Sequence, residues 1–158
     1  MFRWIRFVAA IAVVSASTLP AHADKASDLE RALRTAFNSA DANRNGVLTA
    51  RENNTFVENL FLAMDANGDR RLTQREFHAL SLNLLPLARK YGRVKEYAAA
   101  RERIRRRWKL TGRETQSWTN FMLGAKNELA TAAGGRGRLT FSQFKRARFI
   151  RELADALR

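Results

Sequence analysis

Two twelve-residue segments rich in Asp and Asn constrain this chain more than any other feature. They begin at Asp41 and Asp65 and end at Glu52 and Glu76, so their starts lie 24 positions apart. Residues 53–64 between them contain neither Pro nor Gly, and their apolar side chains recur with helical spacing. One helix must therefore follow the first segment and lead into the second. A helix of about 15 residues is ~22 Å long, so we expect the segments at its opposite ends.

Each segment has the spacing by which a short loop surrounds a calcium ion. Calcium takes six to eight hard oxygen ligands, and the loop supplies them from positions 1, 3, 5, 7, 9 and 12. Position 7 gives a backbone carbonyl, position 9 can hold a water, and Gly46 at position 6 permits the sharp turn. The predicted ligands are Asp41, Asn43, Asn45, Val47, Thr49 and Glu52, then Asp65, Asn67, Asp69, Arg71, Thr73 and Glu76.

The second segment departs from this pattern at Arg70, where Gly is expected. A non-Gly residue at positive φ is strained by on the order of 1 kcal/mol, and a nearby cation weakens calcium binding. The second segment has three carboxylates and the first has two. Charge therefore favours calcium binding by the second segment, whereas backbone strain at Arg70 favours the first. The ranking of the two affinities stays open, and both are expected to be weak, ~10⁻⁵ to 10⁻³ M.

The two segments, each followed by an apolar helical residue (Phe56 or Phe77), resemble the EF-hand family over residues 27–85. The alternative interpretation is a pair of Asx-rich turns between helices. The resemblance implies an all-α fold of tandem helix-loop-helix units with a shared middle helix and bound Ca²⁺. Because the shared helix prevents the usual side-by-side pairing of adjacent hands, each loop needs another partner.

Apolar periodicity predicts helices along the rest of the chain as well. The first helix starts at Ser27, where Ser27 and Glu30 form a capping box. A long helix after Pro86 runs to about Arg107 unless Gly92 breaks it. The predicted helices begin at Ser27, near Ala50, before Phe77 (ending at Pro86), after Pro86, near Trp118 and near Phe144.

The C-terminal half contains two segments that align with the calcium loops through Leu-Thr at positions 8 and 9. They cover residues 103–114 and 132–143. Neither can bind calcium, because Arg, Ala and Gly replace the ligands. Each is either a decayed EF-hand or only a capping box that starts a helix. As decayed hands, they are candidate partners for the two calcium loops.

Charge is distributed unevenly along the chain. Residues 24–80 hold 8 basic and 9 acidic side chains, whereas residues 81–158 hold 19 and 6, so these parts carry −1 and +13. The run from Arg101 to Lys109 has six cations, with Ile104 and Trp108 four residues apart. It either binds an anionic membrane surface, a polysaccharide or an acidic protein, or is a solvated helix face with Trp108 in the core. Nucleic acid is the least favoured partner, because residues 1–23, whose signal-peptide features are described below, predict export.

Residues 1–23 have the features of a signal peptide: a positive start, an apolar run from Phe7 to Val14, and a small-x-small pattern ending at Ala23. We therefore expect an exported, periplasmic or secreted product. It comprises an EF-hand pair at residues 24–85 and a basic helical region at 86–158, in the same compact domain or a second lobe. The absence of Cys excludes disulfides and thiolate metal sites.

No catalytic constellation is found, because His78 has no second histidine or nucleophile beside it in the exported part. The sequence thus predicts a non-enzymatic, bacterial-type exported calcium-binding protein that acts as a sensor, a buffer or a calcium-stabilised adaptor. The alternative is a cationic protein that binds anionic surfaces of the envelope and uses calcium only structurally. The oligomeric state stays open.

Overall fold

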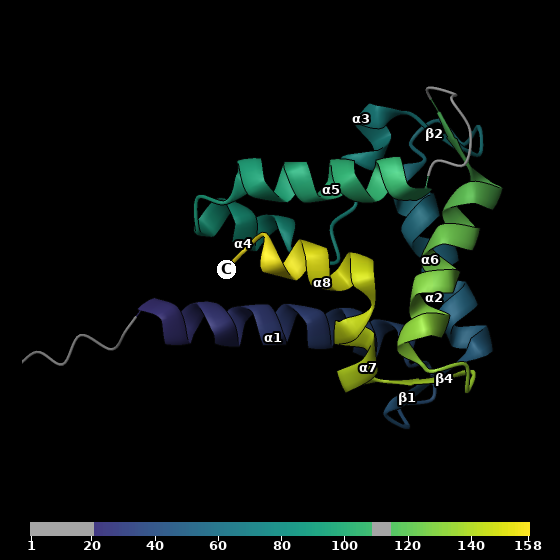
Figure 1. The fold of residues 1–158 in the computed structure, drawn as a ribbon, viewed down its shortest axis with the longest axis horizontal. Coiled ribbons are helices and arrows are strands. Elements are labelled where there is room, and N and C mark those ends of the chain that lie inside the picture. Colours follow the sequence, from purple (N-terminus) through teal and green to yellow (C-terminus); the bar gives the residue numbers. More distant parts are fainter. Residues whose placement is uncertain (1–20, 109–114) are drawn as a thin grey trace, which may run out of the picture.

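The computed structural model describes residues 21–108 and 115–158, which form eight helices and four short strands (Figure 1). The protein is mostly helical, as predicted, but the strands mean that it is not strictly all-α. Residues 1–20 of the predicted signal peptide lie outside the described part. The helices are α1 (Ala21–Ala40), α2 (Ala50–Met64), α3 (Gln74–Phe77), α4 (Leu85–Lys90), α5 (Val94–Trp108), α6 (Trp118–Ala132), α7 (Phe141–Arg146) and α8 (Arg148–Asp155), and the strands are β1 (Val47–Thr49), β2 (Arg71–Leu72), β3 (Gln116–Ser117) and β4 (Arg138–Thr140).

The helix predicted between the two loops is α2, and it begins and ends where expected. Thr49 is its N-cap and forms a reciprocal capping box with Glu52, which satisfies backbone N–H groups that have no partner within the helix. Phe56, Val57, Phe61 and Met64 on its apolar face are buried, whereas Leu62 is exposed. The start predicted for the first helix is wrong, because α1 already runs through Ser27. Ser27 is therefore an exposed residue inside the helix rather than its cap.

The helix predicted to end at Pro86 is much shorter than expected. α3 ends at Phe77, and the chain then turns through Leu82 and Asn83, which have positive φ values of 44° and 62°. Left-handed residues cannot continue an α-helix, and Pro86 opens α4, where its missing N–H costs no hydrogen bond. The possible break at Gly92 is confirmed: Gly92 has φ 65° and separates α4 from α5.

The strands form two separate antiparallel pairs that join distant parts of the sequence. β1 pairs with β4 and β2 pairs with β3, at opposite ends of α2 (Figure 1). α2 connects β1 to β2, α6 connects β3 to β4, and the two helices pack against each other. Two strand-helix-strand units therefore lie head to tail. We call β1-α2-β2 the first unit and β3-α6-β4 the second unit.

One hydrophobic core joins the N-terminal and C-terminal parts of the chain. Phe37 meets Phe144 edge to face, and Phe61 meets Phe121 in the same way, each with ring centroids 5.5 Å apart. Such aromatic pairs contribute packing energy beyond the area they bury. None of the helices in residues 21–108 and 115–158 combines the length and apolar character that crossing a bilayer requires.

Candidate metal site

The first loop, residues 41–52, is folded around the carboxylate of its first residue. Asp41 is 5% exposed, and its Oδ1 and Oδ2 accept hydrogen bonds from the N–H groups of Asn45 (3.1 Å) and Gly46 (2.7 Å). Asn43 Oδ1 also accepts from Asn45 N, and Asn45 Oδ1 accepts from Val47 N. The side-chain oxygens at positions 1, 3 and 5 therefore hold the turn of the loop through its own backbone.

The last residue of this loop folds back over its beginning. Glu52 Oε1 accepts a hydrogen bond from Ala42 N at 3.1 Å, and Oε2 accepts from Thr49 N at 2.9 Å and Thr49 Oγ1 at 2.8 Å. These hydrogen bonds, chiefly the one from the Thr49 backbone, hold the pKa of Glu52 below its ordinary value. Two carboxylates from opposite ends of the loop are thus buried within it.

The second loop, residues 65–76, repeats these contacts. Asp65 Oδ2 accepts from Arg70 N at 3.0 Å, and Glu76 Oε1 accepts from Ala66 N at 3.2 Å. Glu76 Oε2 accepts from both the N–H and the hydroxyl of Thr73, at 2.9 and 2.8 Å. Hydrogen bonds from Thr73 lower the pKa of Glu76, as those from Thr49 do for Glu52. The two loops therefore share one internal design.

Each loop contains one Gly and one Arg in the left-handed region. In the first loop Arg44 has φ 56° and Gly46 φ 79°, and in the second Gly68 has φ 71° and Arg70 φ 59°. The positive φ predicted for Arg70 is confirmed. This strain does not distinguish the loops, because Arg44 occupies the same left-handed region two loop positions earlier, at position 4. The calcium-loop pattern specifies Gly only at position 6, so it gave no reason to expect a positive φ at Arg44.

The acidic side chains of the loops do not converge into a compact cluster. Within residues 21–108 and 115–158, no three Asp, Glu or His side chains lie close enough together to hold a metal ion. The first loop has only two carboxylates. In the second loop, the Asp69 carboxylate accepts hydrogen bonds from neighbouring residues of the same loop, from Arg71 N (2.8 Å) and Asn67 Nδ2 (3.2 Å).

The donor set nevertheless suits a hard cation. Asp65 Oδ1 is buried and accepts no hydrogen bond from any residue in the described part of the chain. A buried carboxylate oxygen without a donor is uncommon and calls for a partner. Both loops offer oxygen donors only, the type that Ca²⁺ prefers, and the remaining predicted ligands Val47 and Arg71 lie at the starts of β1 and β2.

The first loop pairs with residues 132–143, one of the two segments predicted from the sequence as candidate partners. Leu139, at position 8 of that segment, lies opposite Leu48 at position 8 of the first loop. Gln143 stands where the first loop has Glu52: its Oε1 accepts from Thr140 N at 2.9 Å and its Nε2 donates to the Ala133 carbonyl at 3.5 Å. The amide thus closes this segment with a hydrogen bond that a carboxylate could not donate.

The alignment predicted for residues 103–114 is wrong. Residues 103–108 belong to α5, because Ile104 and Trp108 continue the buried face of that helix. The strand that pairs with the second loop is β3, with Gln116 opposite Leu72, six positions after the Leu110 predicted for this place. Leu110 and Glu114 lie outside the described residues. A polar Gln in place of the usual apolar residue hid this register from the sequence pattern.

The predicted basic run is only partly exposed. Arg101 is 6% exposed and its guanidinium lies 4.9 Å from the Tyr97 ring, while Arg105 binds Glu102 at 2.8 Å. Arg106, which also binds Glu102, and Arg103 are the exposed cations in the described part of the run. Lys109 lies outside the described residues. Most of the described cations of this run therefore contact other side chains of the protein.

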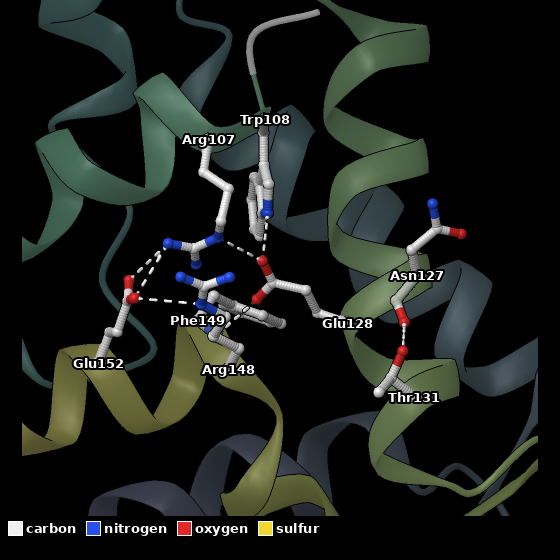
Figure 2. Close-up of polar contacts among 8 residues, drawn as sticks. All are labelled: Arg107, Trp108, Asn127, Glu128, Thr131, Arg148, Phe149 and Glu152. Carbon is white, nitrogen blue, oxygen red and sulfur yellow. Dashed lines mark hydrogen bonds and ion pairs between the residues drawn. The ribbon is translucent and has the colours of Figure 1, made fainter.

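Arg107 belongs to a polar network that joins three helices (Figure 2). Its Nε binds Glu128 on α6 at 2.8 Å, and its Nη1 binds Glu152 on α8 at 2.9 Å. Glu128 also accepts from Trp108 Nε1 at 2.8 Å and from Phe149 N at 2.6 Å. Trp108 is 3% exposed and lies in the core. This position agrees with the alternative in which the basic run is a solvated helix face with Trp108 buried.

The structure thus brings Glu52 to the backbone that follows Asp41, and Glu76 to the backbone that follows Asp65, each within one loop. His78 lies half-buried after α3, and burial lowers its pKa. A scan against protein-family models and searches of curated proteins and of solved structures found no match to this chain.

Proposed function

We propose that the protein binds two calcium ions, one in each of the loops at residues 41–52 and 65–76. The observation that carries the proposal is the position of the last carboxylate of each loop. Glu52 and Glu76 fold back onto the N–H groups at the start of their loops, beside Asp41 and Asp65. A divalent cation bound in the loop would neutralise these carboxylates.

The residues that would hold the ions are the twelve predicted from the sequence. Asp41, Asn43, Asn45 and Glu52 supply side-chain oxygens in the first loop, and Asp65, Asn67, Asp69 and Glu76 supply them in the second. Carbonyls of Val47 and Arg71 and hydroxyls or water at Thr49 and Thr73 complete the sets. Bound calcium would add positive charge where each loop concentrates its negative charge, and so stabilise the folded state.

The pairing of the strands supports membership in the EF-hand family. Each proposed calcium loop adds a short antiparallel strand to a segment that lacks the ligands, β1 to β4 and β2 to β3. The expectation that each loop needs a partner from the C-terminal half thus has a structural counterpart. We interpret the segment at residues 132–143 as a decayed hand, and β3 as part of another.

Within this proposal, a calcium-stabilised adaptor is the best supported role. Phe56, Phe61 and Phe77, on the helices that leave the two loops, are already buried in the shared core. Exposing them as a calcium-dependent binding face would require opening that core. The protein is then an exported, non-enzymatic calcium-binding protein, and the alternative is a cationic surface-binding protein with structural calcium.

Calorimetric titration with calcium tests the proposal. The wild type should take up calcium with weak affinity, and Glu52→Gln and Glu76→Gln should each remove one site, because each loses one ionised ligand. Glu58→Gln is the matched control, since Glu58 is exposed on α2 and far from either loop end in sequence. Absence of calcium heat at several millimolar, with the protein folded, would refute the proposal.

A further inference from the structure

A groove of about 570 Å³ lies between α1 and the C-terminal helices α7 and α8. Figure 1 shows α8 alongside α1, and Lys25 Nζ on α1 donates to the backbone oxygen of Arg158 at 2.7 Å. No residue of the two proposed calcium loops lines it. We propose that this groove binds a fatty acid of about twelve carbons, a function that goes beyond the proposed calcium binding and does not depend on it.

The floor of the groove is apolar. Leu29 and Leu33 contribute from α1, and Ala154 and Leu157 contribute from α8 and the residues after it. All four are at least nine-tenths buried, so they form a wall that belongs to the core and not to mobile surface side chains. An acyl chain laid against this wall loses apolar contact with water, at about 0.8 kcal/mol for each methylene buried.

The rim of the groove is basic and only partly neutralised. Its cations are Lys25, Lys145, Arg146, Arg151 and Arg158, and its carboxylates are Glu30 and Asp155. Glu30 already binds Lys145 at 2.7 Å, and Asp155 binds Arg158 at 2.9 Å.

Arg146 and Arg151 are the cations that a ligand can use. Both are exposed, and neither forms an ion pair or side-chain hydrogen bond with any residue that the structure describes. Arg146 is on α7 and Arg151 on α8, so two guanidinium groups approach the groove from different elements. Guanidinium groups bind carboxylates through paired N–H···O bonds, which matches one carboxylate head.

The size of the groove selects a single-chain ligand over a protein partner. Its volume lies within the roughly 300–1,000 Å³ of small-molecule sites. It is lined by 13 residues, fewer than the about 20–30 residues that one side of a stable protein interface uses. One apolar wall and one pair of free guanidinium groups match one tail and one anionic head.

Calorimetry with dodecanoate below its micelle concentration tests this inference on the purified protein. Dodecanoate should bind one per chain, at least tenfold more tightly than dodecanol, which has the tail without the charge. Acetate, which has the charge without the tail, should not bind. Shortening the acid should weaken binding by about fourfold for each methylene lost from the groove.

Variants locate the site. Arg146→Gln/Arg151→Gln should weaken dodecanoate binding at least tenfold, while Arg89→Gln/Arg103→Gln, an equal loss of exposed charge outside the groove, should leave it unchanged. Circular dichroism confirms that both variants are folded. Binding that is equally strong for dodecanol, equally weakened by both variants, or absent would overturn the inference. Calcium binding by a protein that takes up no dodecanoate would leave the proposed calcium function standing, and the reverse result would refute that function alone.

Discussion

The first and second units use the same scaffold for different purposes. Both consist of a short strand, a 15-residue helix and a second short strand. In both, a hydroxyl caps the helix: Thr49 for α2 and Ser117 for α6. The residue at position 12 differs, since the first unit has Glu52 and the second has Asn120. The comparison shows that caps and apolar packing form this scaffold, and that only the first unit has a carboxylate at this position.

The units also differ in how their central helices are anchored. Four residues after Glu52 the first unit has Phe56, whereas four residues after Asn120 the second has Gly124. Trp108 occupies the space beside Gly124, where a Cβ would lie 2.5 Å from its ring. Glu128 then joins α6 to α5 and α8 (Figure 2). We infer that the second unit is stabilised by internal contacts and the first additionally by calcium.

The largest expected effect is in the second unit. Glu128→Ala should lower the free energy of unfolding by about 3–5 kcal/mol, because it leaves Arg107 Nε, Trp108 Nε1 and the Phe149 N–H without their acceptor. Urea unfolding with and without calcium measures it. The loss should be the same in both conditions, and a loss of under 1 kcal/mol would show that the network does not anchor this unit.

The next effect is in the first unit and depends on calcium. At ten times the dissociation constant, one site stabilises the folded protein by ~1.4 kcal/mol, so two sites contribute about 2.8 kcal/mol. The double variant Glu52→Gln/Glu76→Gln should lose this increment, seen as a melting temperature that no longer rises with calcium. If the variant still responds fully, the ions bind elsewhere.

A smaller effect is expected at the contact between Trp108 and Gly124. Gly124→Ala should destabilise the protein by about 1–2 kcal/mol, because overpacking costs about 1–3 kcal/mol and the gain in helix propensity returns up to about 1. In a Trp108→Leu background the same substitution should cost little or become stabilising. A double-mutant cycle measures this coupling. Purely additive effects would show that the close approach is unimportant.

The smallest effect is pH-dependent and concerns α5. Hydrogen bonds from Arg105, followed by those from Arg106, lower the pKa of Glu102 to about 2, from an ordinary value of 4.5. The folded protein therefore binds fewer protons at this site, and the resulting stability is present above pH 4.5 and is lost as the pH falls toward 2. Glu102→Gln should show a shallower loss of melting temperature over this range than the wild type. Identical profiles would contradict the assignment.

The sequence predicted the first unit well because its signals are local. Loop residues and the apolar stripe of α2 determine their own backbone within a few positions. Leu82 and Asn83 were not predictable, because their left-handed turn arises where Leu80 and Leu84 are buried in the core. The partner of the second loop was missed because Gln116 carries no apolar signal. The ion pairs of Arg107 in α5 were not predicted, because Glu128 and Glu152 are distant in sequence and contact Arg107 only in the folded protein.

Counting bound calcium by native mass spectrometry tests the central claim most directly. At millimolar calcium the folded protein should carry two specifically bound ions, one in each of the loops at residues 41–52 and 65–76 at the two ends of α2, because only those loops combine position-1 and position-12 carboxylates. Magnesium at the same concentration should be bound less, since it requires stricter octahedral geometry. Two calcium ions per chain support the account. No bound ion, or a third ion that requires the second unit, would contradict it.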